Sequence, residues 1–379
     1  LVLLSATKAA AQDSQSQQSQ SPNQQEAPPA AGGPNDDAGP YAIPKKKEAP
    51  PEPAPETPRR VEGMPSYSIN VSVPEVDIPV LVTTKDGQFI PNLKKGNFKV
   101  YEDGVQQNIA NFSESQDAPI TAVLLVEFAQ TNYAFLEDTL TGAYNFAANL
   151  KKNDWVAVEY YDIKPHIIVD FTQNKQAVMG ALNGMRMPEW QETNLFDALY
   201  DTLDRLQSIQ GHKYIVLIST GIDSFSKLRL DEILKKVKGS QDVTIFPVSI
   251  GWAVREYCEV HRCTGALQQR AGLPLTQMDY LQGDNEMNTF ARLTGGRAYF
   301  PRFQAEFPEI FHSILGDIRS QYMLAYHPSN QTQDGTYRKL KVEIIGPDGN
   351  ALKVKDQKGK DVKYQVIAKE GYTAKRTVE

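Results

Sequence analysis

The sequence has few of the residues that catalytic and metal sites usually need. Its five histidines are scattered with no pair at ligand spacing, and its only cysteines are Cys258 and Cys263. No Gly-rich phosphate loop follows the first apolar strand, and Ser219-Thr220-Gly221 lacks the flanking glycines of a nucleophile elbow. We therefore expect a protein that is not an enzyme and has no cofactor.

Long apolar runs and an excess of positive charge are also absent. No run approaches the eighteen residues that a membrane helix needs. The net charge of −6 provides no basic surface for nucleic acid or anionic lipid. Hydrophobic residues make up 40% of the 379 residues, which is ordinary for a globular protein with room for two or three domains. We expect no transmembrane segment and no nucleic-acid partner.

The first residues resemble the end of an export signal. Leu1–Ala6 is apolar, and Ala9–Ala11 before Gln12 fits an A-x-A cleavage site. We interpret residues 1–11 as a signal-peptide remnant and expect an exported protein in the periplasm, on the cell surface or outside the cell. Residues 12–65 hold twelve of the 24 prolines and no apolar period, which predicts a disordered linker. This linker is either a spacer through the envelope or a tail without a function.

The cysteine pair has two interpretations. In an exported protein, two cysteines so close in sequence predict a disulfide between Cys258 and Cys263. Closing so small a loop stabilises a fold by about 2 kcal/mol on the chain-entropy model. His261 lies between them and suggests zinc instead, but two cysteines and one histidine lack a fourth ligand. We favour the disulfide.

Alternating apolar residues predict β-strands on both sides of a central region. Residues 66–115 and 321–373 carry this pattern, and Asp103-Gly104 is a hairpin signal. The alternating runs are Val76–Val82, Phe98–Tyr101, Gln321–Tyr326 and Leu340–Ile345. Because each flank alone offers too few strands to bury a face, we expect both to form one β-sandwich, followed by a tail at 374–379.

The central residues 116–320 alternate apolar runs with helical patterns. Buried strands are predicted at Ala122–Val126, Trp155–Val158, Ile215–Ile218 and Val243–Val248, with His166–Phe171 as an antiparallel neighbour. Helical spacing is found at Leu136–Ala147, Leu195–Leu206, Leu230–Val237 and Phe307–Ile318. Gly295-Gly296 ends another helix before a short strand at Ala298–Phe300. The predicted fold is α/β, with a doubly wound, mostly parallel sheet flanked by β-sandwich segments.

The tip of the first central strand carries a resemblance to a known family. With Glu127, Ala129 and Thr131 after an apolar run, the chain resembles a von Willebrand factor A-type domain, whose first strand ends in an Asp-x-Ser-x-Ser metal-binding motif. Motifs in the flanks and near the end of the central region are similar to the acidobacterial von Willebrand factor A-related family, and together they cover roughly residues 70–373. These motifs are Tyr101-Glu102-Asp103-Gly104, Thr294-Gly295-Gly296-Arg297, Gln321–Tyr326 and Lys369-Glu370-Gly371-Tyr372. The resemblance implies an exported protein.

The resemblance also implies a metal site above the carboxyl ends of the strands, where α/β sheets bind ligands. In the family, the ligands are an Asp and two Ser from the first loop, a Thr from the second and an Asp from the third. The matching positions here hold Glu127, Ala129, Thr131, Thr193 and Thr220. Asp223 lies near the third-loop position but is displaced. We expect a degenerate site, at which Mg²⁺ or Ca²⁺ binds weakly if at all.

Two of these residues also have structural interpretations. Thr193 precedes a predicted helix and suits an N-cap. Glu127 suits a strand-end carboxylate that Thr131 and Thr193 hydrogen-bond.

Residues 252–284 form a long insertion between a strand and the next helix. Connections of this length are usually functional or disordered, and the aromatic residues Trp252, Tyr257 and Tyr280 favour an ordered one. We interpret the insertion as a cap that binds a partner, with a purely structural insertion as the alternative. The resulting hypothesis is an adhesion module that engages a protein or envelope partner through the upper face of the α/β domain. The alternative is a structural subunit that self-assembles into a surface structure or filament.

Overall fold

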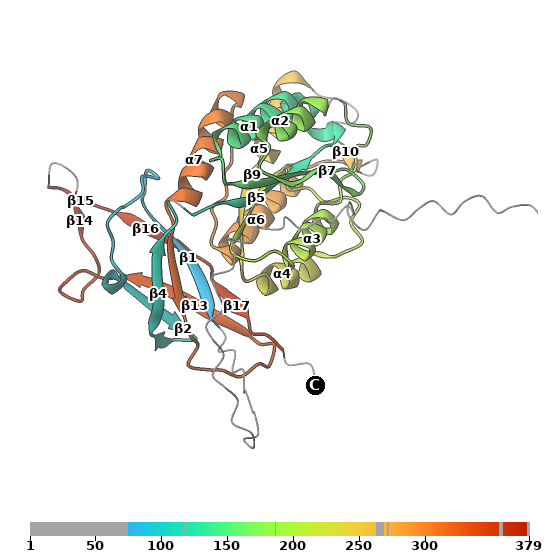
Figure 1. The fold of residues 1–379 in the computed structure, drawn as a ribbon. Coiled ribbons are helices and arrows are strands. Elements are labelled where there is room, and N and C mark those ends of the chain that lie inside the picture. Colours follow the sequence, from blue (N-terminus) through green and yellow to red (C-terminus); the bar gives the residue numbers. More distant parts are fainter. Residues whose placement is uncertain are drawn as a thin grey trace, which may run out of the picture. The chain divides into compact units, whose positions relative to one another are not determined.

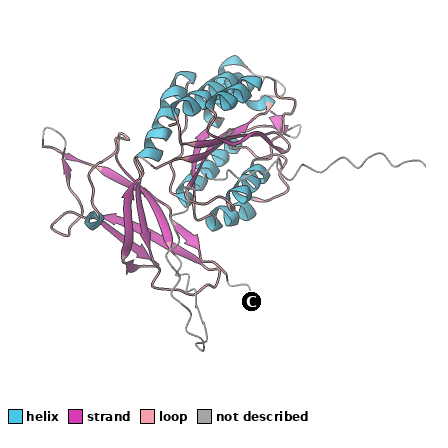
Figure 2. Ribbon diagram, in the orientation of Figure 1, coloured by secondary structure: helices cyan, strands magenta, loops and turns pink. Residues whose placement is uncertain are grey.

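The computed structural model describes residues 75–116, 118–185, 187–262, 269–270, 273–355 and 359–376. For residues 131, 269–270 and 273–274, only the backbone is described. The predicted signal remnant, the predicted linker and Cys263 lie outside these residues, so the expectations about them stay predictions. All described residues belong to one compact unit, whose ribbon is drawn in Figures 1 and 2.

Five strands form the central sheet, in the order β7-β6-β5-β8-β9. They are β5 (Thr121–Glu127), β6 (Trp155–Tyr161), β7 (Pro165–Thr172), β8 (Lys213–Ser219) and β9 (Val243–Ser249). The strands β6, β5, β8 and β9 run parallel to one another, and β7 pairs antiparallel with β6 at the edge of the sheet. Continuous apolar sequences form these strands because helices cover both faces of the sheet. The predicted mixed α/β fold is confirmed.

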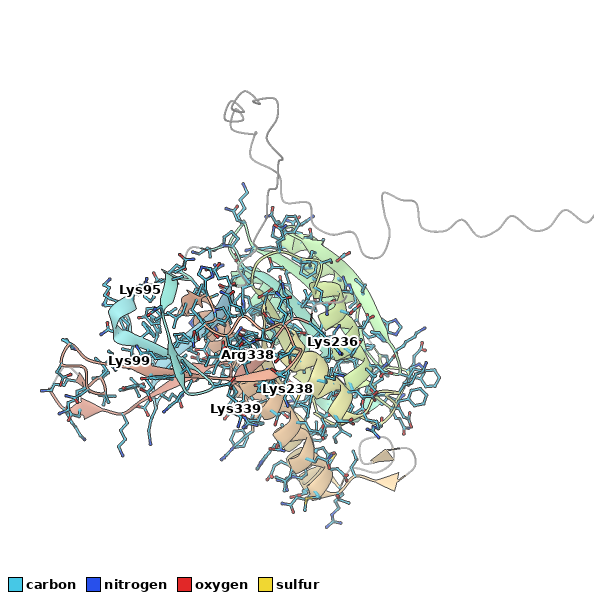
Figure 3. The ribbon with its side chains drawn as sticks, turned by 90° about the horizontal axis from the view of Figure 1, so that it is seen from below. Lys95, Lys99, Lys236, Lys238, Arg338 and Lys339 are labelled. Atoms are coloured by element: carbon cyan, nitrogen blue, oxygen red, sulfur yellow. The ribbon has the colours of Figure 1, made fainter. Side chains whose placement is uncertain are left out.

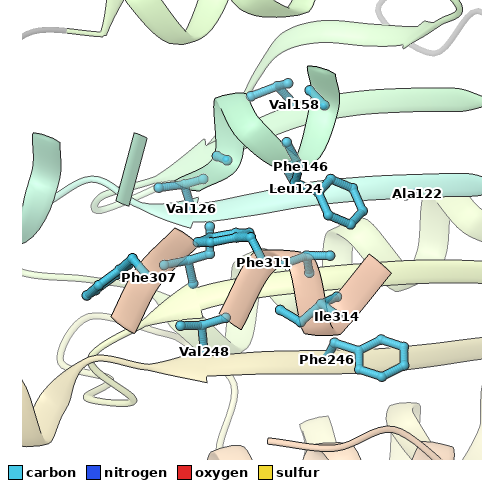
Figure 4. Close-up of a cluster of buried hydrophobic side chains, with 14 of the residues drawn as sticks. Ala122, Leu124, Val126, Phe146, Val158, Phe246, Val248, Phe307, Phe311 and Ile314 are labelled. Atoms are coloured by element: carbon cyan, nitrogen blue, oxygen red, sulfur yellow. The ribbon is translucent and has the colours of Figure 1, made fainter. Parts of the chain in front are cut away.

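Helices pack on both faces of this sheet. One face is covered by α1 (Leu136–Asn149), α2 (Lys175–Gly184), α5 (Gly251–His261) and α7 (Phe307–Arg319). The other face is covered by α3 (Leu195–Leu206), α4 (Leu230–Gly239) and α6 (Gln277–Thr294). In Figure 4, Phe146 of α1 and Phe311 of α7 lie among Leu124, Val158 and Phe246 from the strands.

Helices α1 and α7 cross at close range. A Cβ added to Gly142 of α1 would lie 2.1 Å from the Phe311 ring of α7. A glycine is therefore required at this position for the helices to approach. Among the described residues, no helix is both long and apolar enough to cross a membrane.

The structure differs from the sequence prediction in three elements. Ala298–Phe300 forms no strand; its only pairing is a single bridge between Tyr299 and Val248. The insertion at residues 252–284 was predicted to be ordered but without named elements, and its described residues form most of helix α5 and the first turns of α6. Helix α2 was not predicted, because it buries only Val178 and Leu182 and so has a weak apolar period.

Strands from both flanks pair in two antiparallel sheets. One sheet has the order β16 (Tyr364–Ala368), β1 (Val76–Thr84), β12 (Tyr322–Tyr326) and β4 (Ile109–Glu114). The other has the order β17 (Gly371–Thr373), β13 (Tyr337–Ile344), β2 (Phe98–Glu102) and β3 (Val105–Gln107). Side chains from both sheets share one apolar core. The turn between β2 and β3 has positive φ at Asp103 and Gly104, as a type I′ hairpin requires.

Shorter elements complete the described chain. Two ribbons pair β10 (Gln269–Arg270) with β11 (Leu273–Pro274) and β14 (Val354–Lys355) with β15 (Asp361–Val362). Three 3₁₀ helices are η1 (Lys95–Asn97), η2 (Gln130–Phe135) and η4 (Gln304–Glu306).

A buried ion pair links strands from the two flanks inside the sandwich. Arg338 of β13 donates to the carboxylate of Glu102 of β2 at 3.2 Å, and both side chains are 3% exposed. The hydroxyls of Tyr326 and Tyr372 donate to the same carboxylate. Figure 3 labels Arg338 beside the exposed Lys339 of the same strand. We call these four residues the Glu102 cluster: Glu102, Tyr326, Arg338 and Tyr372.

Candidate functional site

The candidate site lies where β5 and β8 end at the carboxyl edge of the sheet. Glu127 is the last residue of β5 and is 0% exposed. The parallel register aligns Glu127 with Tyr161 of β6 and Val126 with Ile218 of β8. Ser219 and Thr220 therefore follow directly beside the Glu127 carboxylate.

Hydroxyls and a backbone amide hold that carboxylate. Oε2 of Glu127 accepts hydrogen bonds from Ser219 Oγ at 2.8 Å and from the Thr220 backbone N–H at 2.7 Å. The Thr220 hydroxyl lies 3.0 Å from Oε1 and 2.9 Å from Oε2. Burying a carboxylate is costly unless its oxygens are hydrogen-bonded, and this arrangement meets that requirement. We call Glu127, Tyr161, Ser219 and Thr220 the Glu127 site.

Tyr161 extends the hydrogen-bond network into the sheet. Its hydroxyl donates to Ser219 Oγ at 2.8 Å, and Ser219 in turn donates to Glu127. Burial, reinforced by the negative charge of Glu127, raises the pKa of Tyr161 well above its usual value. The phenol therefore remains protonated and able to donate.

Hydrogen bonds join the loop before α3 to the loop after β8. Thr193 Oγ1 donates to the Ile222 carbonyl at 2.6 Å, and the backbone N–H groups of Ser224 and Phe225 donate to the Thr193 carbonyl. Asp223 accepts from Ser226 Oγ at 2.5 Å and from the Phe196 N–H at 3.3 Å. Thr193 thus links two loops rather than capping α3.

The residues at the predicted ligand positions do not fit a metal ion. The Thr220 hydroxyl donates a hydrogen bond to the Glu127 carboxylate, so these groups satisfy each other. Ala129 is buried, and its side chain has no atom that could bind a metal. Asp223 is engaged at the start of α3, and only the backbone of Thr131 is described. Among the described residues, no group of three or more His, Cys, Asp or Glu side chains gathers that could hold a metal. The prediction of weak binding stays a prediction.

Ser219 and Tyr161 are the members of the site that sequence reasoning missed. Both end strands that neighbour β5 in the sheet. A polar residue at the end of an apolar strand was the available signal, because parallel neighbours align such ends beside Glu127.

The predicted partner-binding residues of the insertion lie mostly within the domain. Tyr280 is 5% exposed and joins the apolar core, so in this structure it is not a surface residue. Tyr257 packs against Phe135 in an edge-to-face contact, and Trp252 lies beneath the Arg255 guanidinium. Cys258 is buried on α5, and its predicted partner Cys263 lies outside the described residues, so the disulfide stays a prediction.

Five of the exposed apolar side chains lie on chain segments around the Glu127 site, and two of these five, Met278 and Leu281, belong to the insertion. Three connections contribute them: the loop before α3, the loop after β8 and the start of α6. Their exposed fractions are between 46% and 70%, for Met187, Trp190, Phe225, Met278 and Leu281. We call these five residues the upper apolar surface.

Backbone contacts join the three connections. The Gln130 N–H donates to the Trp190 carbonyl at 2.8 Å, and the Phe225 N–H donates to the Thr193 carbonyl at 2.8 Å. A Cβ added to Gly221 would lie 2.7 Å from the backbone of Gly283 in α6. The loops that carry the upper apolar surface are therefore fixed to one another at the sheet edge.

Comparisons with known proteins found partial likenesses to solved structures and assign no activity. No protein-family model matches the chain, and no curated protein matches it. A von Willebrand factor type A protein from Catenulispora acidiphila is 10% identical, with a TM-score of 0.41 over 80% of this chain and 75% of that chain. The conserved hypothetical protein BatB from Bacteroides thetaiotaomicron is 13% identical, with a TM-score of 0.41 over 53% of this chain and 100% of that one.

The vWF domain of the type V pili tip protein Mfa5 from Porphyromonas gingivalis is a further neighbour. It is 11% identical, with a TM-score of 0.37 over 52% of this chain and 96% of that chain. The similarity to these three structures covers between 52% and 80% of this chain. At these identities the similarity concerns the fold alone.

Proposed function

We propose that the protein is an exported, non-catalytic binding module that contacts a protein or envelope partner through the upper apolar surface. The observation that supports this most directly is the exposure of Trp190 (46%) and Phe225 (55%) on hydrogen-bonded loops at the sheet edge. Aromatic residues held on a rigid support contribute strongly to protein interfaces, because little conformational entropy is lost when a partner covers them.

The state of the Glu127 site favours binding over catalysis. The hydroxyls of Ser219 and Thr220 both donate to the Glu127 carboxylate, and none of the three residues is more than 2% exposed, so a substrate cannot reach these hydroxyls in this structure. The site instead fixes the geometry of the loop that carries Phe225. Export rests on the apolar residues 1–6 and the alanines before Gln12.

A pull-down from cell-envelope fractions tests the proposed surface. The Trp190→Ser/Phe225→Ser variant should recover its partner about tenfold less than the unmodified protein, because both residues are exposed and removing them costs no core packing. The matched control is Val105→Ser, which removes an apolar side chain that is 58% exposed on the sandwich.

Equal recovery by the double variant and the unmodified protein would contradict the proposal. The contribution of the insertion is tested separately with Met278→Ser/Leu281→Ser. Deleting residues 253–284 is unsuitable, because it would remove the buried Tyr280 and the close approach of Gly283 to Gly221.

A further inference from the structure

A groove runs between helices α1 and α2, apart from the upper apolar surface. It has a volume of about 910 Å³, within the range of pockets that accept a ligand or a short peptide. Its apolar lining comes from η2, α1 and α2, through Tyr133, Leu136, Leu140, Tyr144, Leu182 and Met185. Tyr133 of this lining is 50% exposed, so the groove is open to solvent.

The charge of the groove has one sign. Glu137 and Asp138 line it, and no Lys or Arg does so among the described residues. Glu137 is exposed and Asp138 is half-buried beside it. Partial burial and the neighbouring charge of Glu137 raise the pKa of Asp138. A cation placed here would relieve the repulsion between the two carboxylates.

The chain contains a segment of complementary chemistry outside the described residues. Tyr41-Ala42-Ile43-Pro44 is followed directly by Lys45-Lys46-Lys47. An aromatic and an aliphatic residue thus stand next to three consecutive positive charges. We propose that residues 41–47 dock in the groove between α1 and α2 of the same chain, with Tyr41 and Ile43 on its apolar lining and the lysines at Glu137 and Asp138.

The intervening chain gives this segment a long reach. The 27 residues 48–74 separate Lys47 from the first described residue, Glu75. Fully extended, they span roughly 90 Å. Tethering also gives the segment an effective concentration in the millimolar range, so a weak contact is occupied within one chain. The groove is then a peptide site that holds a segment of its own chain until a similar basic sequence displaces it.

Carbodiimide cross-linking of the full chain tests this, because the reagent joins lysine amines to carboxylates that touch them. Cross-links from Lys45–Lys47 to Glu137 and Asp138 should exceed those to the exposed Glu309 of α7 by about tenfold, since Glu309 reports random collisions. Mixing ¹⁵N-labelled and unlabelled protein identifies the source, and the cross-linked pairs should carry a single isotope.

Two variants separate docking from simple charge attraction. Tyr41→Ser/Ile43→Ser keeps all three lysines, and Tyr133→Ser alters an exposed groove residue without touching the core. Each should lower the cross-link yield by roughly fivefold, as expected for losing apolar contacts. The control Arg59→Ala/Arg60→Ala should leave the yield unchanged. Yields equal to those at Glu309, isotopically mixed pairs, or yields insensitive to the serine variants would each overturn the proposal.

Discussion

Glu102 in the β-sandwich and Glu127 in the α/β part are both buried carboxylates, but different groups stabilise them. Glu102 is 3% exposed and accepts from the Arg338 guanidinium and two tyrosine hydroxyls. Glu127 is 0% exposed, and its described donors are neutral: the Ser219 and Thr220 hydroxyls and one backbone N–H.

The difference follows from where each carboxylate lies. Glu102 is on β2, which pairs with β13 from the other end of the sequence. Its ion pair with Arg338 of β13 links the two strands. Glu127 lies at the carboxyl edge of the central sheet, where β5 ends. There, Thr220 supplies hydrogen bonds through its backbone N–H and its hydroxyl. Glu102 thus stabilises the sandwich, whereas Glu127 fixes the shape of a surface loop.

Breaking the ion pair of the Glu102 cluster should have the largest effect. Arg338→Met leaves a buried carboxylate without its cation and removes donors to the Asn330 and Thr332 carbonyls. We expect a loss of about 3–5 kcal/mol in the free energy of unfolding. Denaturant titration measures this. The control Arg338→Met/Glu102→Gln should recover part of the loss, and a double variant no more stable than Arg338→Met would contradict the pairing.

A smaller effect is expected from the loop that carries Thr220. Gly221 has a φ of +78°, and an added Cβ would lie 2.7 Å from the Gly283 backbone. Gly221→Ala should therefore lower the free energy of unfolding by about 2–3 kcal/mol. The matched control is Gly180→Ala in α2, where nothing lies within 4 Å and about 0.5–1 kcal/mol of stabilisation is expected. Similar thermal stability of both variants would contradict the close crossing of this loop and α6.

Replacing the Glu127 carboxylate with an amide should have a still smaller effect. In Glu127→Gln, one oxygen becomes an NH₂ group that faces the donors of Ser219 and Thr220. The expected loss is about 1–2 kcal/mol in the free energy of unfolding, because the side chain keeps its shape while donors oppose each other. If chemical denaturation shows no loss, the carboxylate is not the acceptor on which the loop depends.

The sequence was sufficient for the fold wherever an apolar period was strong. The strands β5, β6, β8 and β9 and the helix α3 follow directly from runs of buried residues. Helix α5 was not predicted, because it buries only four residues and lies within a segment interpreted as an insertion. Periodicity therefore identifies elements that bury a full face and misses those that bury little.

The candidate site could be predicted only in part. Glu127 was identified by its place after an apolar strand, and Thr220 by the family resemblance. The sequence could not show that the Thr220 hydroxyl turns toward Glu127 rather than outward, because this depends on the positive φ of Gly221 and the register of β5 and β8. Tyr280 was predicted on the surface because aromatic residues in a presumed loop favour a partner, yet its helix packs on the core.

The most direct test is the effect of Mg²⁺ on the unfolding free energy of the unmodified protein, because the central claim is that hydroxyls satisfy Glu127 in place of a metal. With dissociation at or above millimolar concentration, millimolar Mg²⁺ should change stability by at most about 0.4 kcal/mol. The variant Glu127→Asp/Ala129→Ser/Thr220→Asp, which restores the family's motif, should gain metal-dependent stability. A stabilisation of the unmodified protein by several kcal/mol that Glu127→Ala abolishes would contradict the claim.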